Sequence, residues 1–252
     1  MDWNNDIKRW PNHERSELIR CEPHVWHVQN NGNGPKLLFL HGTGASLHSW
    51  APLINSLGKE IQSIVIDLPG HGFTELGTTQ RSSLTLMVKD IIRLIRHIDY
   101  KPDIIVGHSA GVAIALEISR EIVIKGVFGV NPALSKFSGV AGFAFPMIAK
   151  VMAINPLTSI YLAGLGKSRT RVDRLLKATG SVLNESQIAL YHKLFQDKKH
   201  IQGTLLMMAQ WNLDRLLFRL SQIPVPSLFV TGQLDKTVSP RTLELQKKKD
   251  TR

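Results

Sequence analysis

The pentapeptide Gly107-His108-Ser109-Ala110-Gly111 constrains the fold more than any other segment of the chain. It fits the pattern Gly-x-Ser-x-Gly, and it lies between a short apolar run at 104–106 and a helical pattern at 110–120. In this setting a serine sits on a sharp strand-to-helix turn, with its hydroxyl above the sheet and the positive end of the helix beside it. We therefore predict a nucleophile elbow with Ser109 as the nucleophile. The alternative is a glycine-rich strand–helix junction that carries no chemistry.

Other apolar runs predict further strands of the same sheet. Four runs are typical of strands buried on both faces, and they lie at 36–41, 64–67, 124–130 and 227–231. The segment from Ser83 to Ile98 has apolar residues at helical spacing. Strands that alternate with helices predict an α/β fold with a mostly parallel, doubly wound sheet. The polar residues 1–24 are interpreted as an irregular lead-in, and 25–28 as extended.

Residues 132–222 break this alternation. The segment is mostly helical in pattern and carries 12 Lys and Arg against 4 Asp and Glu. We interpret it as a helical cap inserted into a core made of residues 1–131 and 223–252. The positive charge indicates either a solvated surface or contact with an anionic lipid, an acidic protein or a carboxylate ligand. We do not expect nucleic acid as a partner, because aromatic residues are not interspersed among the basic residues as they are in known nucleic-acid-binding modules.

A second glycine-rich loop, His41-Gly42-Thr43-Gly44, follows the run at 36–41. Such a loop can direct backbone N–H groups at the oxygen of a substrate that the serine attacks. We predict that the N–H groups of Thr43 and Ala110 form the oxyanion hole.

These segments resemble the α/β-hydrolase superfamily from about residue 25 to 238. Within it, they are most similar to the magnesium chelatase accessory proteins of bacteriochlorophyll biosynthesis. The more specific matches are Trp10-Pro11-Asn12 and the stretch from Met207 to Leu213. The resemblance implies a serine hydrolase of ester, thioester or amide bonds, a small-molecule or tetrapyrrole substrate, and magnesium chelatase as a partner. The single cysteine, Cys21, fits a reducing compartment, so we expect a cytoplasmic protein, and the basic cap suggests peripheral contact with the inner membrane.

The superfamily orders its catalytic triad as serine, acid and histidine. Asp235, just after the run at 227–231, matches the acid, although a turn or helix-cap role is the alternative. Asn131 is a weaker candidate for a polar group that lines the site. None of the 17 residues after Asp235 is a histidine, so we expect the last strand and helix of the fold to be missing from this chain.

Two functions therefore stay open. The first is a serine hydrolase, with catalysis impaired because serine needs a base within hydrogen-bond reach. The second is a non-catalytic porphyrin-binding or chelatase-assisting protein. Among the ten histidines, His41 and His71 could line the mouth of the site, whereas His108 is expected to point away from Ser109. We expect no cofactor and no resident metal, because the chain has one cysteine and no cluster of carboxylates.

Overall fold

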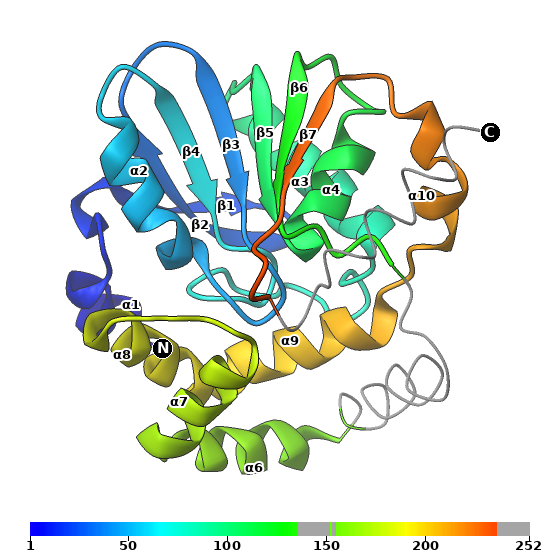
Figure 1. The fold of residues 1–252 in the computed structure, drawn as a ribbon. Coiled ribbons are helices and arrows are strands. Elements are labelled where there is room, and N and C mark those ends of the chain that lie inside the picture. Colours follow the sequence, from blue (N-terminus) through cyan, green and yellow to red (C-terminus); the bar gives the residue numbers. More distant parts are fainter. Residues whose placement is uncertain (136–151, 153–154, 236–252) are drawn as a thin grey trace.

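The sheet confirms the predicted α/β architecture. The computed structural model describes residues 1–135, 152 and 155–235. Seven strands form one sheet in the order β1-β2-β4-β3-β5-β6-β7 (Figure 1). Neighbouring strands from β4 to β7 pair in parallel, whereas β2 pairs antiparallel with both β1 and β4. The strands are β1 (Ser16–Cys21), β2 (His24–Asn31), β3 (Lys36–Leu40), β4 (Gln62–Ile66), β5 (Ile104–His108), β6 (Gly126–Val130) and β7 (Ser227–Val230).

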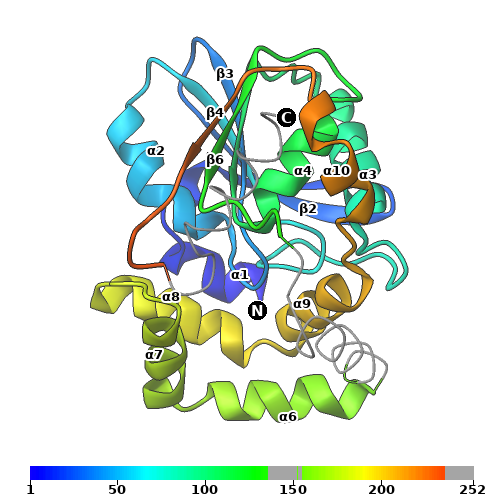
Figure 2. The same cartoon turned by 45° about the vertical axis from the view of Figure 1, so that its right-hand side comes forward.

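Helices cover both faces of the sheet. Figure 2 shows α2 on one face and α3, α4 and α10 on the other. Alternation along β3 explains why both faces are apolar: Phe39 packs in the cluster with Trp50 and Ile54, while Leu38 and Leu40 pack in the cluster with α3 and α4. The helices of this part are α1 (Trp3–Asp6), α2 (Ala51–Leu57), α3 (Leu84–His97), α4 (Ala110–Ile118) and α10 (Asp214–Phe218).

The remaining four described helices form a layer beyond the carboxyl ends of the parallel strands (Figure 1). They are α6 (Pro156–Gly166), α7 (Arg169–Ala178), α8 (Glu185–Gln196) and α9 (Lys198–Gln210), and we call them the cap. A Cβ atom at Gly203 of α9 would lie 2.1 Å from the carbonyl oxygen of Gly70, so the cap and the core meet backbone to backbone. The predicted cap boundaries, 132 and 222, stay predictions. Leu213 and Leu216, at the start of and within α10, are buried in the core cluster with α3.

Two expectations were wrong. Residues 16–21 form the edge strand β1 rather than part of an irregular lead-in, and their charged side chains face solvent, which hides the strand pattern. The strand β7 is not buried on both faces, since Leu228 and Val230 are exposed. The expected missing strand and helix concern residues outside the described part of the chain. Within the described part, no helix has the length and apolar character that crossing a membrane requires.

Candidate active site

Ser109 lies on the turn between β5 and α4 with the backbone angles φ 52° and ψ −114°. A positive φ is unusual for a serine and is typical of strain stored at a functional turn. The two flanking positions must be glycine, because a Cβ atom at either one would overlap neighbouring backbone atoms. A Cβ atom at Gly107 would lie 2.6 Å from the carbonyl carbon of Gly111, and one at Gly111 would lie 2.3 Å from the carbonyl oxygen of Leu40. The sequence pattern therefore produces the predicted elbow geometry, and the Ser109 side chain is partly exposed.

The loop after β3 touches this elbow. A Cβ atom at Gly42 would lie 3.0 Å from the Cβ atom of Ser109, so the residue before Thr43 is in close contact with the serine. Ala110 is the first residue of α4, and its N–H therefore has no acceptor within the helix. The hydroxyl of Thr43 donates to the sulfur of Met207 in α9 at 3.4 Å, so the cap reaches this loop. Ser109, Thr43 and Ala110 thus come together, while their catalytic roles stay predictions.

Asp235 lies on the same edge of the sheet. The register aligns His108 with Val130 and Val130 with Val230, so the turns after β5, β6 and β7 are neighbours. The side-chain oxygen of Asn131 accepts a hydrogen bond from the Gly232 N–H at 2.7 Å and holds the loop that leads to Asp235. Burial lowers the pKa of His108, and the carboxylate of Asp235 opposes this shift, so the acid lies within electrostatic reach of the elbow. Asn131 therefore positions the loop of the candidate acid.

His108 directly precedes Ser109 and contacts the same loop. Its Nδ1 atom lies 3.0 Å from the position that a Cβ atom at Gly42 would occupy. Its ring contacts Trp50 edge to face, with ring centroids 6.4 Å apart. In the described part of the chain, no hydrogen bond joins His108 to Ser109.

His41 and His71 do not line the mouth of the site as expected. Both are fully buried, and they form one cluster with His200 of α9, with neighbouring ring centroids 5.3 Å apart. His41 donates from Nδ1 to the Gly42 carbonyl at 2.8 Å and accepts at Nε2 from the Leu68 N–H at 2.9 Å. A ring with both nitrogens occupied by backbone groups is a structural element and not a free base.

The other two rings of the cluster are also occupied. His71 donates from Nδ1 to the Pro69 carbonyl at 3.1 Å and lies 3.4 Å from the Thr204 hydroxyl. His200 accepts from the Gly72 N–H and donates to the Gly44 carbonyl, each at 3.1 Å, and so joins the cap to two core loops. Burial lowers the pKa of His41 to about 3 and that of His71 to about 4, so these rings are neutral. The sequence carries no pattern that distinguishes such histidines from catalytic ones.

Asp67 is a second buried group that the sequence analysis missed. Its carboxylate accepts from His27 Nδ1 at 2.7 Å and from the N–H groups of Leu47 and Phe73 at 2.7 and 2.9 Å. Burial raises the pKa of Asp67, but His27 and these donors outweigh it and bring the pKa to about 2. The carboxylate therefore organises the loops below the site. Across the described residues, no group of three His, Cys, Asp or Glu side chains could hold a metal ion.

Comparison with known proteins identifies the family. The sequence pattern of the alpha/beta hydrolase fold matches residues 35–249. The chain belongs to the α/β-hydrolase family. It is 40% identical over 231 residues to the magnesium-chelatase 30 kDa subunit of Rhodobacter capsulatus, covering 91% of this chain and 81% of that protein.

Solved structures agree on the fold of this α/β hydrolase. A lipase candidate from Acinetobacter baumannii superposes with a TM-score of 0.75 at 19% identity, covering 98% of this chain and 84% of that chain. The Cif epoxide hydrolase from Acinetobacter nosocomialis gives a TM-score of 0.71 at 18% identity, covering 92% and 77%. At these identities the likeness concerns the fold and not the reaction.

Proposed function

We propose that this α/β hydrolase is a serine hydrolase that acts on an ester, thioester or amide in the magnesium chelatase branch of bacteriochlorophyll biosynthesis. The backbone of Ser109, held in its strained turn against the 42–44 loop, is the observation that carries the proposal. The similarity to a magnesium-chelatase 30 kDa subunit supports the pathway.

The chemistry follows from the arrangement of the site. The Ser109 Oγ atom would attack the substrate carbonyl carbon as a base takes its proton, and the carbonyl oxygen would become an oxyanion. Within the described residues no hydrogen bond joins Ser109 to such a base, so we expect this step to be slow. The N–H groups of Thr43 and Ala110 stabilise that charge, an effect worth about 3–4 kcal/mol for one such donor in a comparable enzyme. The leaving group departs with a proton, and water then releases the acyl group from Ser109. Asp235 would orient and stabilise the base.

A fluorophosphonate probe tests the nucleophile directly, because it forms a covalent bond with an activated serine. We expect labelling of the chain, and loss of labelling in Ser109→Ala. Ser186→Ala is the matched control, since Ser186 is an exposed serine of the cap helix α8. Labelling that persists in Ser109→Ala would contradict the proposal, and so would a wild-type chain that takes up no probe.

A second candidate function is favoured by the histidines. His41, His71 and His200 make structural hydrogen bonds, and within the described residues none of these rings can serve Ser109 as a base. The same fold could then hold a tetrapyrrole for the chelatase without hydrolysis. Titration with protoporphyrin IX and its magnesium complex distinguishes this function. A spectral shift at micromolar concentration, together with absent probe labelling, would favour it over the hydrolase.

We propose a cytoplasmic protein that contacts the inner membrane through its cap. Lys167, Arg171 and Arg174 are exposed on or next to α7, where they could meet lipid headgroups or the carboxylates of a ligand. Co-sedimentation with anionic vesicles, compared with neutral vesicles, tests this location.

A further inference from the structure

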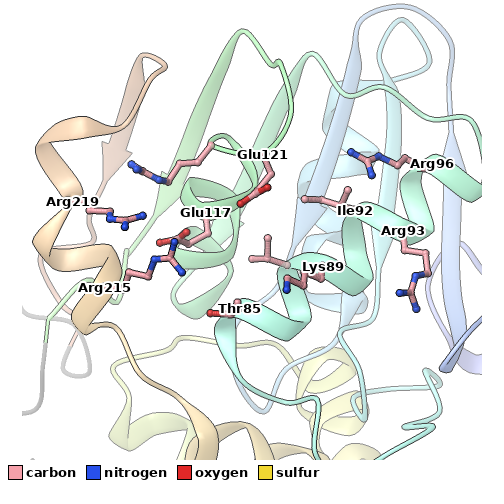
Figure 3. Close-up of a pocket in the computed structure, with 11 residues that line it drawn as sticks. Thr85, Lys89, Ile92, Arg93, Arg96, Glu117, Glu121, Arg215 and Arg219 are labelled. Atoms are coloured by element: carbon pink, nitrogen blue, oxygen red, sulfur yellow. The ribbon is translucent and has the colours of Figure 1, made fainter.

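A basic groove lies between α3, α4 and α10, away from Ser109. Its volume is about 390 Å³, and Figure 3 shows charged side chains from three elements around it. The elbow lies at the start of α4, whereas the groove is lined by Glu117 at the other end of this helix and by Glu121 just beyond it. We call it the α3–α10 groove. Its lining residues are Thr85, Val88, Lys89, Ile92, Arg93, Arg96, Glu117, Arg120, Glu121, Arg215 and Arg219.

The groove concentrates unneutralised positive charge. Six of its lining residues are Lys or Arg and two are Glu. None of the six cations takes part in an ion pair within the described residues. Arg93 and Arg120 donate to the backbone carbonyls of Glu22 and Gln222, and such neutral acceptors leave the positive charge in place. Like charges this close repel one another, and an acidic ligand would relieve the repulsion.

Five of the six cations are arranged in two rows. Lys89, Arg93 and Arg96 follow one another along α3 at helical spacing, and all three are exposed. Arg215 lies in α10, and Arg219 is the residue that follows the end of this helix. The two arginines are four residues apart and lie on the opposite wall of the groove (Figure 3). Buried apolar side chains of α3, Val88 and Ile92, also line the groove. Apolar lining between two basic rows complements an amphipathic helix that carries carboxylates along its edges.

We propose that the α3–α10 groove binds an acidic amphipathic helix of a partner protein. The apolar side chains of Val88 and Ile92 in the lining favour a helix with an apolar stripe over a phosphate strand. Glu117 and Glu121 inside the groove would also repel a continuous run of phosphates (Figure 3). This proposal does not depend on the reaction at Ser109.

Fluorescence anisotropy tests the groove with a labelled helical peptide that presents a Leu stripe between two rows of Glu. We expect binding to the wild-type chain that weakens with added salt, and no binding of the same peptide with Gln in place of Glu. The groove variant Lys89→Glu/Arg96→Glu/Arg215→Glu should bind the Glu peptide at least about tenfold more weakly. Ser109→Ala should bind it as the wild type does.

The control removes the same charge elsewhere. Lys8→Glu/Arg9→Glu/Lys59→Glu changes three exposed cations outside both the groove and the cap and should bind the peptide within about twofold of the wild type. Thermal unfolding verifies that each variant is folded, and Lys89→Gln/Arg96→Gln/Arg215→Gln replaces the groove variant if charge reversal prevents folding. Equal loss in the groove and control variants would overturn the proposal. So would tighter binding of single-stranded DNA or of anionic vesicles at the groove than of the Glu peptide.

Discussion

At the scale of single residues, Asn131 links two strand ends through one side chain. It has a positive φ of 43°, which asparagine tolerates, and its side chain accepts the Gly232 N–H. We predict that Asn131→Ala raises the hydrogen-exchange rate of the Gly232 amide by about five- to tenfold, because one hydrogen bond contributes about 1 kcal/mol. Mass-spectrometric exchange measures it.

Asn131→Asp provides the comparison for this exchange experiment. Aspartate keeps the oxygen acceptor and also tolerates a positive φ, so protection of Gly232 should stay near the wild-type level. If both variants exchange alike, the amide is protected by something other than this side chain, and Asn131 would not position the loop that leads to Asp235.

The sequence predicted the elbow at Ser109 more accurately than it predicted the roles of the histidines. The positions of Ser109, Gly107 and Gly111 follow from a local pattern, because the turn needs these residue types at these spacings. The roles of His41, His71 and His200 follow from backbone groups far away in the sequence, such as the Gly44 carbonyl and the Gly72 N–H. No local pattern encodes such partners, so the sequence could not separate structural histidines from a catalytic one.

At the scale of elements, two helical glycines have opposite surroundings. Gly111 of α4 lies against β3, where a Cβ atom would be 2.3 Å from the Leu40 carbonyl oxygen, whereas a Cβ atom at Gly164 of α6 meets nothing within 4 Å. We predict that Gly111→Ala destabilises the chain by about 3 kcal/mol. Gly164→Ala should stabilise it by up to about 1 kcal/mol, since alanine favours a helix. Urea unfolding of both variants measures the difference, and equal effects would contradict the tight packing of α4.

The elements that the sequence predicted are those with a strong apolar pattern. The strands β3 to β6 and the helix α3 lie within a few residues of their predicted limits, because each buries an apolar face. The strand β1 was missed because its residues show no period of two: Glu17 and Arg20 flank the apolar pair Leu18 and Ile19 on an exposed edge. The short helix α2 follows a buried 3₁₀ turn at 47–50 and has no distinct stripe of its own, so tertiary packing decides its place.

At the scale of the whole molecule, buried neutral histidines link the stability of the fold to pH. Burial lowers the pKa of His41 to about 3 and those of His48 and His71 to about 4. The unfolded chain takes up these protons near pH 6.5, whereas the folded chain does so only near pH 4 for His48 and His71 and near pH 3 for His41. Stability should therefore be complete above about pH 6.5 and fall as the pH drops towards 4, by about 3 kcal/mol for each fully buried ring. Thermal unfolding across this range measures the loss.

A substitution at His48 isolates one contribution to this pH dependence. The His48 ring is buried and contacts Trp10 and Tyr191 of α8 edge to face, so phenylalanine preserves this ring packing and removes the titration. It also removes the hydrogen bond between Nδ1 and the Ser46 hydroxyl, 2.6 Å apart, a loss that lowers stability equally across this pH range. We expect His48→Phe to lose less stability between pH 6.5 and 4 than the wild type. His13→Phe, on the surface, should follow the wild type. A pH profile unchanged by His48→Phe would show that this ring is not linked to folding.

Folding alone would not keep a serine at position 109. Glycine adopts a φ of 52° without penalty, so a library at this position that is sorted only for thermal stability should converge on glycine. If the hydroxyl had no function, replacement of Ser109 by glycine would be tolerated during evolution. The difference in stability between the Ser109→Gly variant and the wild type therefore measures how strongly selection retains the hydroxyl. This measurement does not require the substrate to be known.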